Sequence, residues 1–171
     1  MNRWVLAIAL FLIGSAGACR PTPPPMEVPA AELSPADTAH ADILARVRHY
    51  YADLSARDWA AYAEDFWPGA TIHTLWDADG SGSANPFVVT VPEFIRRAPE
   101  GPGSQPIFEE RLLAAEVRLT GNLAQVWARY EARFGDSTAV DTWTGVDAFT
   151  LLEHQGVWRI ASLAYVPDLP R

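Results

Sequence analysis

LAQVWARYEARF, residues 123–134, is a stretch in which apolar and polar side chains alternate. Ala128 and Tyr130 belong to one set, and Trp127 and Arg129 belong to the other. Because successive side chains of a β-strand point to opposite faces, the pattern predicts a strand whose apolar inner face carries Tyr130. The other set predicts an outer face with cross-strand ion pairs, and Trp127 on that face suggests a partner protein.

The same alternation continues on both sides of this strand. Gly121-Asn122 precedes it and Gly135-Asp136 follows it, and such pairs are typical of the turns in β-hairpins. Residues 154–156 predict a third turn. The predicted strands are therefore residues 70–76, 87–90, 108–119, 123–134, 138–152 and 157–166.

A helical period of three to four residues precedes these strands. Ser34, Pro35 and Asp37 suit the N-cap and the first and third positions of a helix, which is predicted to break at Arg57-Asp58. A second short helix is predicted to start at residue 59 and end before residue 68, and a third is predicted at residues 91–97. Helices first and antiparallel strands last predict an α+β fold with the helices on one face of the sheet.

The N-terminal segment has the pattern of a targeting signal. Residues 1–18 hold one Arg, an apolar run and a zone of small residues, which together predict a lipoprotein signal peptide. Residues 15–19 resemble the bacterial lipobox, so Cys19 is expected to be acylated and to become the first residue of the mature chain. The alternative is a plain secretory signal, with Cys19 as an unmodified thiol.

The residues after Cys19 predict how the chain meets the membrane. Residues 19–35 are rich in proline, which favours an extended tether, so membrane contact is expected through the lipid anchor alone. Arg20, rather than Asp, follows Cys19, and by resemblance to Gram-negative sorting rules this implies the outer membrane. The expected location is the cell envelope, facing the periplasm.

Composition and motif spacing exclude several classes of function. The net charge of −8 disfavours a nucleic-acid partner, and a single Cys precludes an intramolecular disulfide or a Cys-based zinc site. Residues 77–82 match the first half of a calcium loop, but Val88 stands where the bidentate Glu should be. No metal site and no cofactor are therefore predicted.

Four segments together carry a family resemblance. YYADLSARDWAAYA at 50–63, FWPGATI at 66–72, GVDAFTLL at 145–152 and GVWRIASL at 156–163 resemble the nuclear transport factor 2-like superfamily, which includes SnoaL-like and ketosteroid isomerase-like proteins. The resemblance implies a cone-shaped, curved mixed sheet that wraps the N-terminal helices around a mostly apolar pocket. We assign this domain to residues 36–171. The resemblance also implies a homodimer formed through the outer face of the sheet.

The same resemblance selects two candidate positions. Tyr50 stands where ketosteroid isomerases keep a Tyr that donates a hydrogen bond to an oxyanion, although Tyr50 could instead simply pack in the core. Thr74 stands where those enzymes keep the Asp that abstracts a proton, and a hydroxyl of this kind does not take protons at neutral pH. Ketosteroid isomerisation by that mechanism is therefore not expected.

Asp147 is the most informative residue of the sequence. It shares strand parity with Phe149 and Leu151, so it should face the core, where a carboxylate needs a partner or becomes protonated. It is either an acid, a base or a ligand-orienting group, or it is a structural carboxylate paired with an Arg or a Tyr hydroxyl. Four further residues are expected to line the pocket: Thr74, Trp76, Tyr130 and Trp143.

Three functions fit these observations. The first is binding of a small apolar or aromatic ligand without catalysis, and the second is a SnoaL-like cyclase, isomerase or hydratase that uses Asp147 with Tyr50 or Tyr130. The third is a dimeric accessory protein with a filled interior. An acidic or basic group beside Asp147 would favour the enzyme, and the sequence alone identifies no such group.

Overall fold

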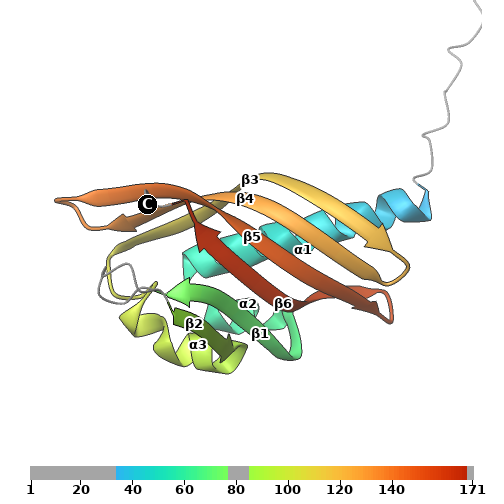
Figure 1. Ribbon diagram of the computed structural model, residues 1–171, viewed down its shortest axis with the longest axis horizontal. Coiled ribbons are helices and arrows are strands. Elements are labelled where there is room, and N and C mark those ends of the chain that lie inside the picture. Colours follow the sequence, from blue (N-terminus) through green and yellow to red (C-terminus); the bar gives the residue numbers. More distant parts are fainter. Residues whose placement is uncertain (1–33, 77–84, 169–171) are drawn as a thin grey trace, which may run out of the picture. The chain divides into compact units, whose positions relative to one another are not determined.

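A computed structural model describes residues 34–76 and 85–168, and Figure 1 shows how their helices and strands are arranged. Six strands form one sheet in the order β2-β1-β6-β5-β4-β3. Neighbouring strands are antiparallel except β1 and β6, which are parallel, so the sheet is mixed, as the resemblance implies. The elements are α1 (Pro35–Ala56), α2 (Trp59–Glu64), β1 (Phe66–Trp76), β2 (Asn85–Thr90), α3 (Val91–Arg97), η1 (Ala98–Glu100), β3 (Ile107–Thr120), β4 (Leu123–Gly135), β5 (Val140–His154) and β6 (Val157–Pro167).

The ends of α1 follow the predicted capping residues. The Ser34 hydroxyl accepts a hydrogen bond from the Asp37 amide at 3.2 Å, and the Asp37 carboxylate accepts one from the Ser34 amide at 3.3 Å. These reciprocal bonds form a capping box, which satisfies two amides at the free end of the helix. At the other end, Arg57 has a φ of 54° and stops the helix, and Asp58 then caps α2 through the Ala61 amide.

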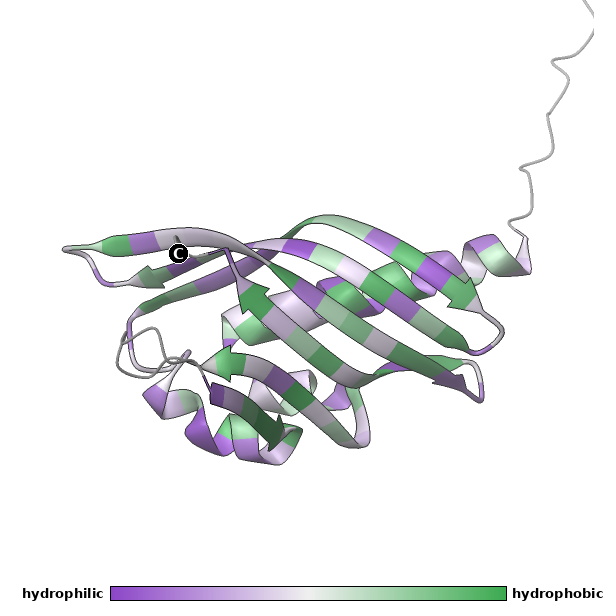
Figure 2. Cartoon of the chain, viewed as in Figure 1, coloured by the Kyte–Doolittle hydropathy of each residue, from purple (hydrophilic) through white to green (hydrophobic). Residues whose placement is uncertain are grey.

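The core lies between α1 and the inner face of the sheet. Ile43, Val47 and Leu54 on α1 and Val126 and Phe149 on the sheet are at most 2% exposed. Burial of this kind stabilises the fold by roughly 1.5–3 kcal/mol for each large apolar side chain. Figure 2 shows hydrophobic and hydrophilic residues alternating along the strands, which is the pattern of a sheet with one buried face.

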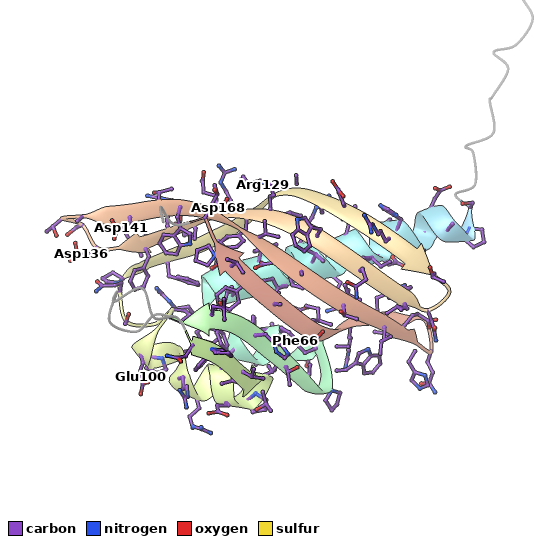
Figure 3. All side chains as sticks on the ribbon, viewed as in Figure 1. Phe66, Glu100, Arg129, Asp136, Asp141 and Asp168 are labelled. Atoms are coloured by element: carbon purple, nitrogen blue, oxygen red, sulfur yellow. The ribbon has the colours of Figure 1, made fainter. Side chains whose placement is uncertain are left out.

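The outer face of the sheet carries charged pairs and exposed apolar side chains. Arg111 pairs with Glu131 at 2.9 Å and Arg133 pairs with Glu109 at 2.7 Å, which confirms the predicted cross-strand ion pairs. Arg129 pairs with Asp168 at 2.9 Å, and Figure 3 labels both residues near the C-terminal end of the described chain. Apolar side chains more than half exposed are Leu75, Val88, Trp127 and Val166.

Three strands depart from simple alternation: β1, β3 and β6, where Ala161 is skipped in the pairing with β5. β1 starts at Phe66 rather than at residue 70, because it includes an irregular segment between Phe66 and Thr71 in its pairing with β6. Within it, Gly69 has a φ of 85°, a conformation that glycine adopts at little cost. β3 contains a bulge between Leu112 and Ala114, which leaves Leu113 without a partner on β4.

No helix within the described ranges, 34–76 and 85–168, is long and apolar enough to cross a membrane. The predicted signal peptide, Cys19, most of the proline-rich tether and the calcium-like residues 77–82 all lie outside these ranges.

Candidate functional site

Asp147 lies in a row of residues that crosses the inner face of the sheet. Asp147 on β5 pairs with Tyr165 on β6, and Tyr165 pairs with Thr74 on β1. On the other side, Asp147 pairs with Ala128 on β4. Because residues paired in this way point to the same face, these side chains share the inner face. Asp147 is 2% exposed, as its strand parity predicts.

A tyrosine hydroxyl holds the Asp147 carboxyl group. Tyr51, on α1, donates a hydrogen bond to Asp147 Oδ2 at 2.5 Å, and the Tyr51 side chain is itself 3% exposed. Burial raises the pKa of Asp147 to about 7, against the opposing effect of the Tyr51 hydrogen bond. Burial and the adjacent carboxyl group together raise the pKa of Tyr51, so the hydroxyl keeps its proton and remains a donor.

A second carboxyl group, on Glu110, faces the same interior. Glu110 pairs with Ala132 of β4, which is fully buried, and Ser55 of α1 hydrogen-bonds to both the amide and the carbonyl of Glu110 at 2.8 and 2.9 Å. Burial, and then the nearby Asp147, raise the pKa of Glu110 well above its usual value. Among the described residues, no side chain hydrogen-bonds to the Glu110 carboxyl group.

Sequence reasoning missed Glu110 because of the bulge in β3. Beyond the bulge, Val117 and Leu119 pair with the inward-facing set of β4. Strict alternation from these positions places residue 109 inside and residue 110 outside. The extra residue, Leu113, reverses the phase, so that Phe108 and Glu110 face inward. The signal available in the sequence was the shared parity of Glu110 with Phe108.

Aromatic side chains surround the two carboxyl groups. Tyr50 makes edge contacts with Tyr51 and Phe149, at ring-centroid distances of 5.0 and 5.1 Å. Tyr62 is fully buried and packs against Tyr50, with ring centroids 5.5 Å apart. Tyr130 lies over Gly145, where an added Cβ would come within 2.5 Å of the ring, so only glycine fits beneath it.

The predicted site residues are placed as follows. Tyr50 packs among aromatic rings, and its neighbour Tyr51 is the tyrosine bonded to Asp147. The Thr74 hydroxyl donates a hydrogen bond to the Tyr165 carbonyl at 2.8 Å, so the hydroxyl proton is bonded to the backbone of the neighbouring strand. Trp143 pairs with Ala132 and is partly buried. Trp76 ends β1, and its side chain lies outside the described part of the structure.

A third buried carboxylate provides a contrast. Asp65, 1% exposed, pairs with Arg46 at 2.6 Å, and Arg46 also donates to the Trp158 carbonyl at 3.0 Å. Burial still raises the pKa of Asp65 to about 6, although the Arg46 guanidinium opposes the shift. Asp65 therefore has the basic partner expected of a structural carboxylate, whereas neither Asp147 nor Glu110 has one in the described part of the chain.

This arrangement allows three kinds of chemistry. A protonated carboxyl group can donate a hydrogen bond or a proton, an ionised one can accept a proton, and an ionised pair can bind a positive charge. No group of three or more His, Cys, Asp or Glu side chains within residues 34–76 and 85–168 is arranged to hold a metal ion.

Comparison with known proteins identifies the fold. No protein-family model and no curated protein matches the sequence. An NTF2-like protein of unknown function from Silicibacter pomeroyi superimposes with a TM-score of 0.58 at 18% identity, over 79% of this chain and 100% of the other. This chain has the NTF2-like fold.

The NTF2-like fold serves proteins of different function. A hexachlorocyclohexane dehydrochlorinase from Novosphingobium barchaimii matches with a TM-score of 0.62 at 12% identity, over 77% of this chain and 88% of the other. The β subunit of a benzoate 1,2-dioxygenase from Burkholderia mallei matches with a TM-score of 0.58 at 15% identity, over 81% and 93%. Function must therefore be argued from the residues inside the fold.

Proposed function

We propose that the NTF2-like domain binds a small molecule with an apolar or aromatic body, whose polar end meets Asp147. The observation that carries this proposal is a carboxyl group, 2% exposed, that has no basic partner among the described residues. A carboxylate offers about four acceptor positions, and Tyr51 is the one side chain in the described structure that donates to it. We propose that the ligand meets the remaining acceptor positions of Asp147.

The surroundings of Asp147 favour a ligand with an aromatic or apolar body. Tyr51 of α1 and Phe149 of β5 lie beside it, and Tyr130 and Tyr165 come from the strands on either side of β5. Aromatic walls with a few polar groups are typical of small-molecule sites.

The test is a ligand screen on the purified chain, with native mass spectrometry for any small molecule that copurifies. Ligands should raise the melting temperature of wild type and should lose most of this effect in Asp147→Asn. Arg133→Gln, on the outer face, is the control and should respond like wild type. A ligand that protects Asp147→Asn and wild type equally would contradict the assignment of Asp147.

Catalysis of proton transfer is the second candidate function. The observation that favours it is a second inward-facing carboxyl group, that of Glu110. An acid and a base are both available when two carboxyl groups of raised pKa share one interior. Isomerisation, dehydration and cyclisation need such a pair, here Asp147 with Glu110 and with Tyr51 or Tyr130 as hydrogen-bond donor. Turnover that survives in Asp147→Asn and Glu110→Gln would exclude this candidate.

We further propose that the chain is anchored in the cell envelope through an acylated Cys19, in the outer membrane facing the periplasm. The position of Cys19 directly after a zone of small residues supports this. Cys19→Ala should release the protein from the membrane fraction or leave it as an uncleaved precursor. Processing and membrane fractionation identical to wild type would contradict anchoring by Cys19.

A homodimer through the outer face is the remaining proposal. Trp127 is 58% exposed there and borders a groove of about 440 Å³ whose other lining residues include Glu116, Arg118 and Gln125. Exposed aromatic side chains on a patch of this kind are typical of protein interfaces. Sedimentation should give a dimer for wild type and a monomer for Trp127→Glu, and a monomeric wild type would contradict the proposal.

A further inference from the structure

One end of the domain carries both the start of α1 and two of the strand turns. Figure 1 shows the start of α1 at the same end of the molecule as the ends of β3 and β5. The contacts agree. Arg46, halfway along α1, donates a hydrogen bond to the Trp158 carbonyl just after the β5–β6 turn, and the Glu153 amide donates one to the Asn122 carbonyl of the β3–β4 turn, at 3.0 and 2.9 Å. Because Ser34 caps α1, the chain that precedes it joins the domain at this end.

Aliphatic side chains lie exposed on the outer face of the sheet at this end. Leu123 of β4 pairs with Leu152 of β5, and Leu152 pairs with Arg159 of β6. Val157 is two residues before Arg159 on β6 and therefore shares its face. Leu123, Leu152 and Val157 are between 40% and 41% exposed. Neighbouring exposed apolar side chains, unlike single ones, are typical of a surface that contacts a partner or a membrane.

Arg159 adds a cation without an acidic partner. Its guanidinium lies over the Trp67 ring, 5.3 Å from the centroid, and Trp67 Nε1 donates a hydrogen bond to the Leu152 carbonyl at 3.0 Å. In the described part of the chain, Arg159 Nε has no hydrogen-bond partner and the guanidinium pairs with no carboxylate, whereas Arg129 and Arg133 on the same face each do. A planar guanidinium is well suited to binding a phosphate. We call the following residues the turn-end surface: Trp67, Leu123, Leu152, Val157 and Arg159.

We propose that the turn-end surface contacts the phospholipid surface in which Cys19 anchors the chain, with Arg159 on a lipid phosphate and the aliphatic side chains at the boundary between headgroups and acyl chains. The inference rests on the proposed anchoring and adds which face the domain presents to the membrane. Residues 20–33 can span at most about 50 Å, so the anchor holds this end of the domain near the bilayer at a high effective concentration. Trp and Arg side chains are both suited to a membrane interface.

Charge favours this end of the outer face. The chain has a net charge of −8, so an anionic lipid surface repels the molecule as a whole. At the turn end, however, Arg118 of β3 also pairs with no carboxylate of the described residues. Asp37 and Glu153, two acids at this end, accept hydrogen bonds from backbone amides, Asp37 in the capping box and Glu153 from Gly156 at 2.5 Å. The contact should therefore be weak without the anchor and should weaken further at high salt.

The contact is separate from the groove proposed for the dimer. Leu123 and Trp127 are four residues apart on β4, which corresponds to about 13 Å along the strand. The two proposals therefore use different parts of the outer face, and variants of the turn-end surface should leave the oligomeric state unchanged.

The experiment places the acylated chain in vesicles of phosphatidylethanolamine and phosphatidylglycerol that carry bromine on their acyl chains near the headgroups. Flotation measures anchoring, and quenching of tryptophan fluorescence by bromine measures contact of the domain with the bilayer. Wild type should be quenched, and Trp67→Phe should remove most of the quenching. Val157→Glu should also lose most of it while floating as before. Val166→Glu is the matched control, because it makes the same change on the same strand and face at the other end.

A second pair of variants tests the cation. Arg159→Gln should reduce the quenching and its dependence on salt, whereas Arg133→Gln changes the net charge equally and should behave like wild type. Thermal unfolding of each variant in solution verifies that the fold is intact. Should Val157→Glu fail to fold, the arginine pair still decides.

The outcomes separate the contact from the anchor. Flotation of wild type without quenching would overturn the inference and leave anchoring by Cys19 standing. Equal quenching of Val157→Glu and Val166→Glu, or of Arg159→Gln and Arg133→Gln, would assign the contact to another face and would also overturn it. A chain that does not float would contradict anchoring and, with it, the contact that depends on the anchor.

Discussion

The two faces of the sheet place glutamate side chains in different environments. On the outer face, Glu109 pairs with Arg133 at 2.7 Å, in contact with solvent. One residue further along β3, Glu110 faces the interior and has no basic partner in the described structure. Solvent screens the outer pair, so it contributes little to stability, whereas the inner carboxyl group, which is only partly exposed, loses part of its hydration without a compensating charge. The contrast separates groups that solubilise the sheet from groups available to a ligand.

The largest difference between the faces should appear on truncating an aromatic side chain. Phe149 is fully buried against Tyr50 and Tyr51, so Phe149→Ala should lower the free energy of unfolding by about 3–5 kcal/mol. Within a single protomer, Trp127→Ala on the outer face should change it by less than about 0.5 kcal/mol, and any larger loss should depend on protein concentration, as the proposed dimer requires. Urea denaturation measures both. A large loss for Trp127→Ala would mean that this side chain is covered in solution, as a dimer requires.

The pH dependence of stability should come from the inner face. Because burial raises the pKa of Asp147 to about 7, the folded chain keeps a proton that the unfolded chain releases above its ordinary value of 3.8. The free energy of unfolding should therefore fall as pH rises from about 4 to 7, by at most about 1.4 kcal/mol per pH unit. Asp147→Asn removes this contribution and should be more stable than wild type near neutral pH.

Other ionisable groups also make the free energy of unfolding depend on pH in this range, and variants of those residues separate their contributions. Glu110 and Asp65 also have raised pKa values, so they add slopes of the same sign, and Asp147→Asn alone should leave part of the dependence. The double variant Asp147→Asn with Glu110→Gln should flatten it further. Glu109→Gln should follow the wild-type curve. Stability of wild type that increases from pH 4 to 7 would contradict the unpaired state of the inner carboxyl groups.

A smaller effect should follow from filling the space under Tyr130. In Gly145→Ala the new methyl group would overlap the Tyr130 ring, at a cost of about 1–3 kcal/mol. Removing the ring with Tyr130→Ala should make the same substitution nearly neutral, because nothing then occupies that position. A double-mutant cycle on thermal unfolding measures this coupling. Strictly additive effects would show that the ring and the glycine do not interact.

The smallest effect is expected for an ion pair on the outer face. Arg133 and Glu109 are 47% and 59% exposed, so Arg133→Ala should cost no more than about 1 kcal/mol. The loss should shrink further at high salt, which screens exposed charges. Denaturation curves at low and high sodium chloride measure it. A larger loss that does not depend on salt would mean that the outer face is buried in solution.

Local rules were sufficient for most of the fold. The cap at Ser34, the break at Arg57-Asp58 and the short helix Val91–Arg97 each depend on a few neighbouring residues, and the structure has them where the sequence predicts them. The alternation on β4 likewise separates Tyr130, 3% exposed, from Trp127, 58% exposed. Such features are readable because neither caps nor strand parity depends on distant contacts.

The site was harder to predict because it depends on irregular and long-range features. A bulge has no clear sequence signature, so the phase of Glu110 could not be read from the alternation of Val117 and Leu119. The choice between Tyr50 and Tyr51 depends on how far α1 is rotated over β5, which only packing determines. Asp147 was found because β5 has no irregularity between it and Phe149.

The bulge in β3 also decides how related chains should be aligned with this one. Loss of the single codon for Leu113 would remove the unpaired residue and restore regular alternation, because Leu112 and Ala114 already pair with neighbouring residues of β4. Glu110 would still pair with Ala132 and face the interior. One in-frame deletion would thus shorten the strand without changing which acidic side chain lies on its inner face. Related chains that differ by one residue at this point would be expected to keep the same inward-facing set of side chains.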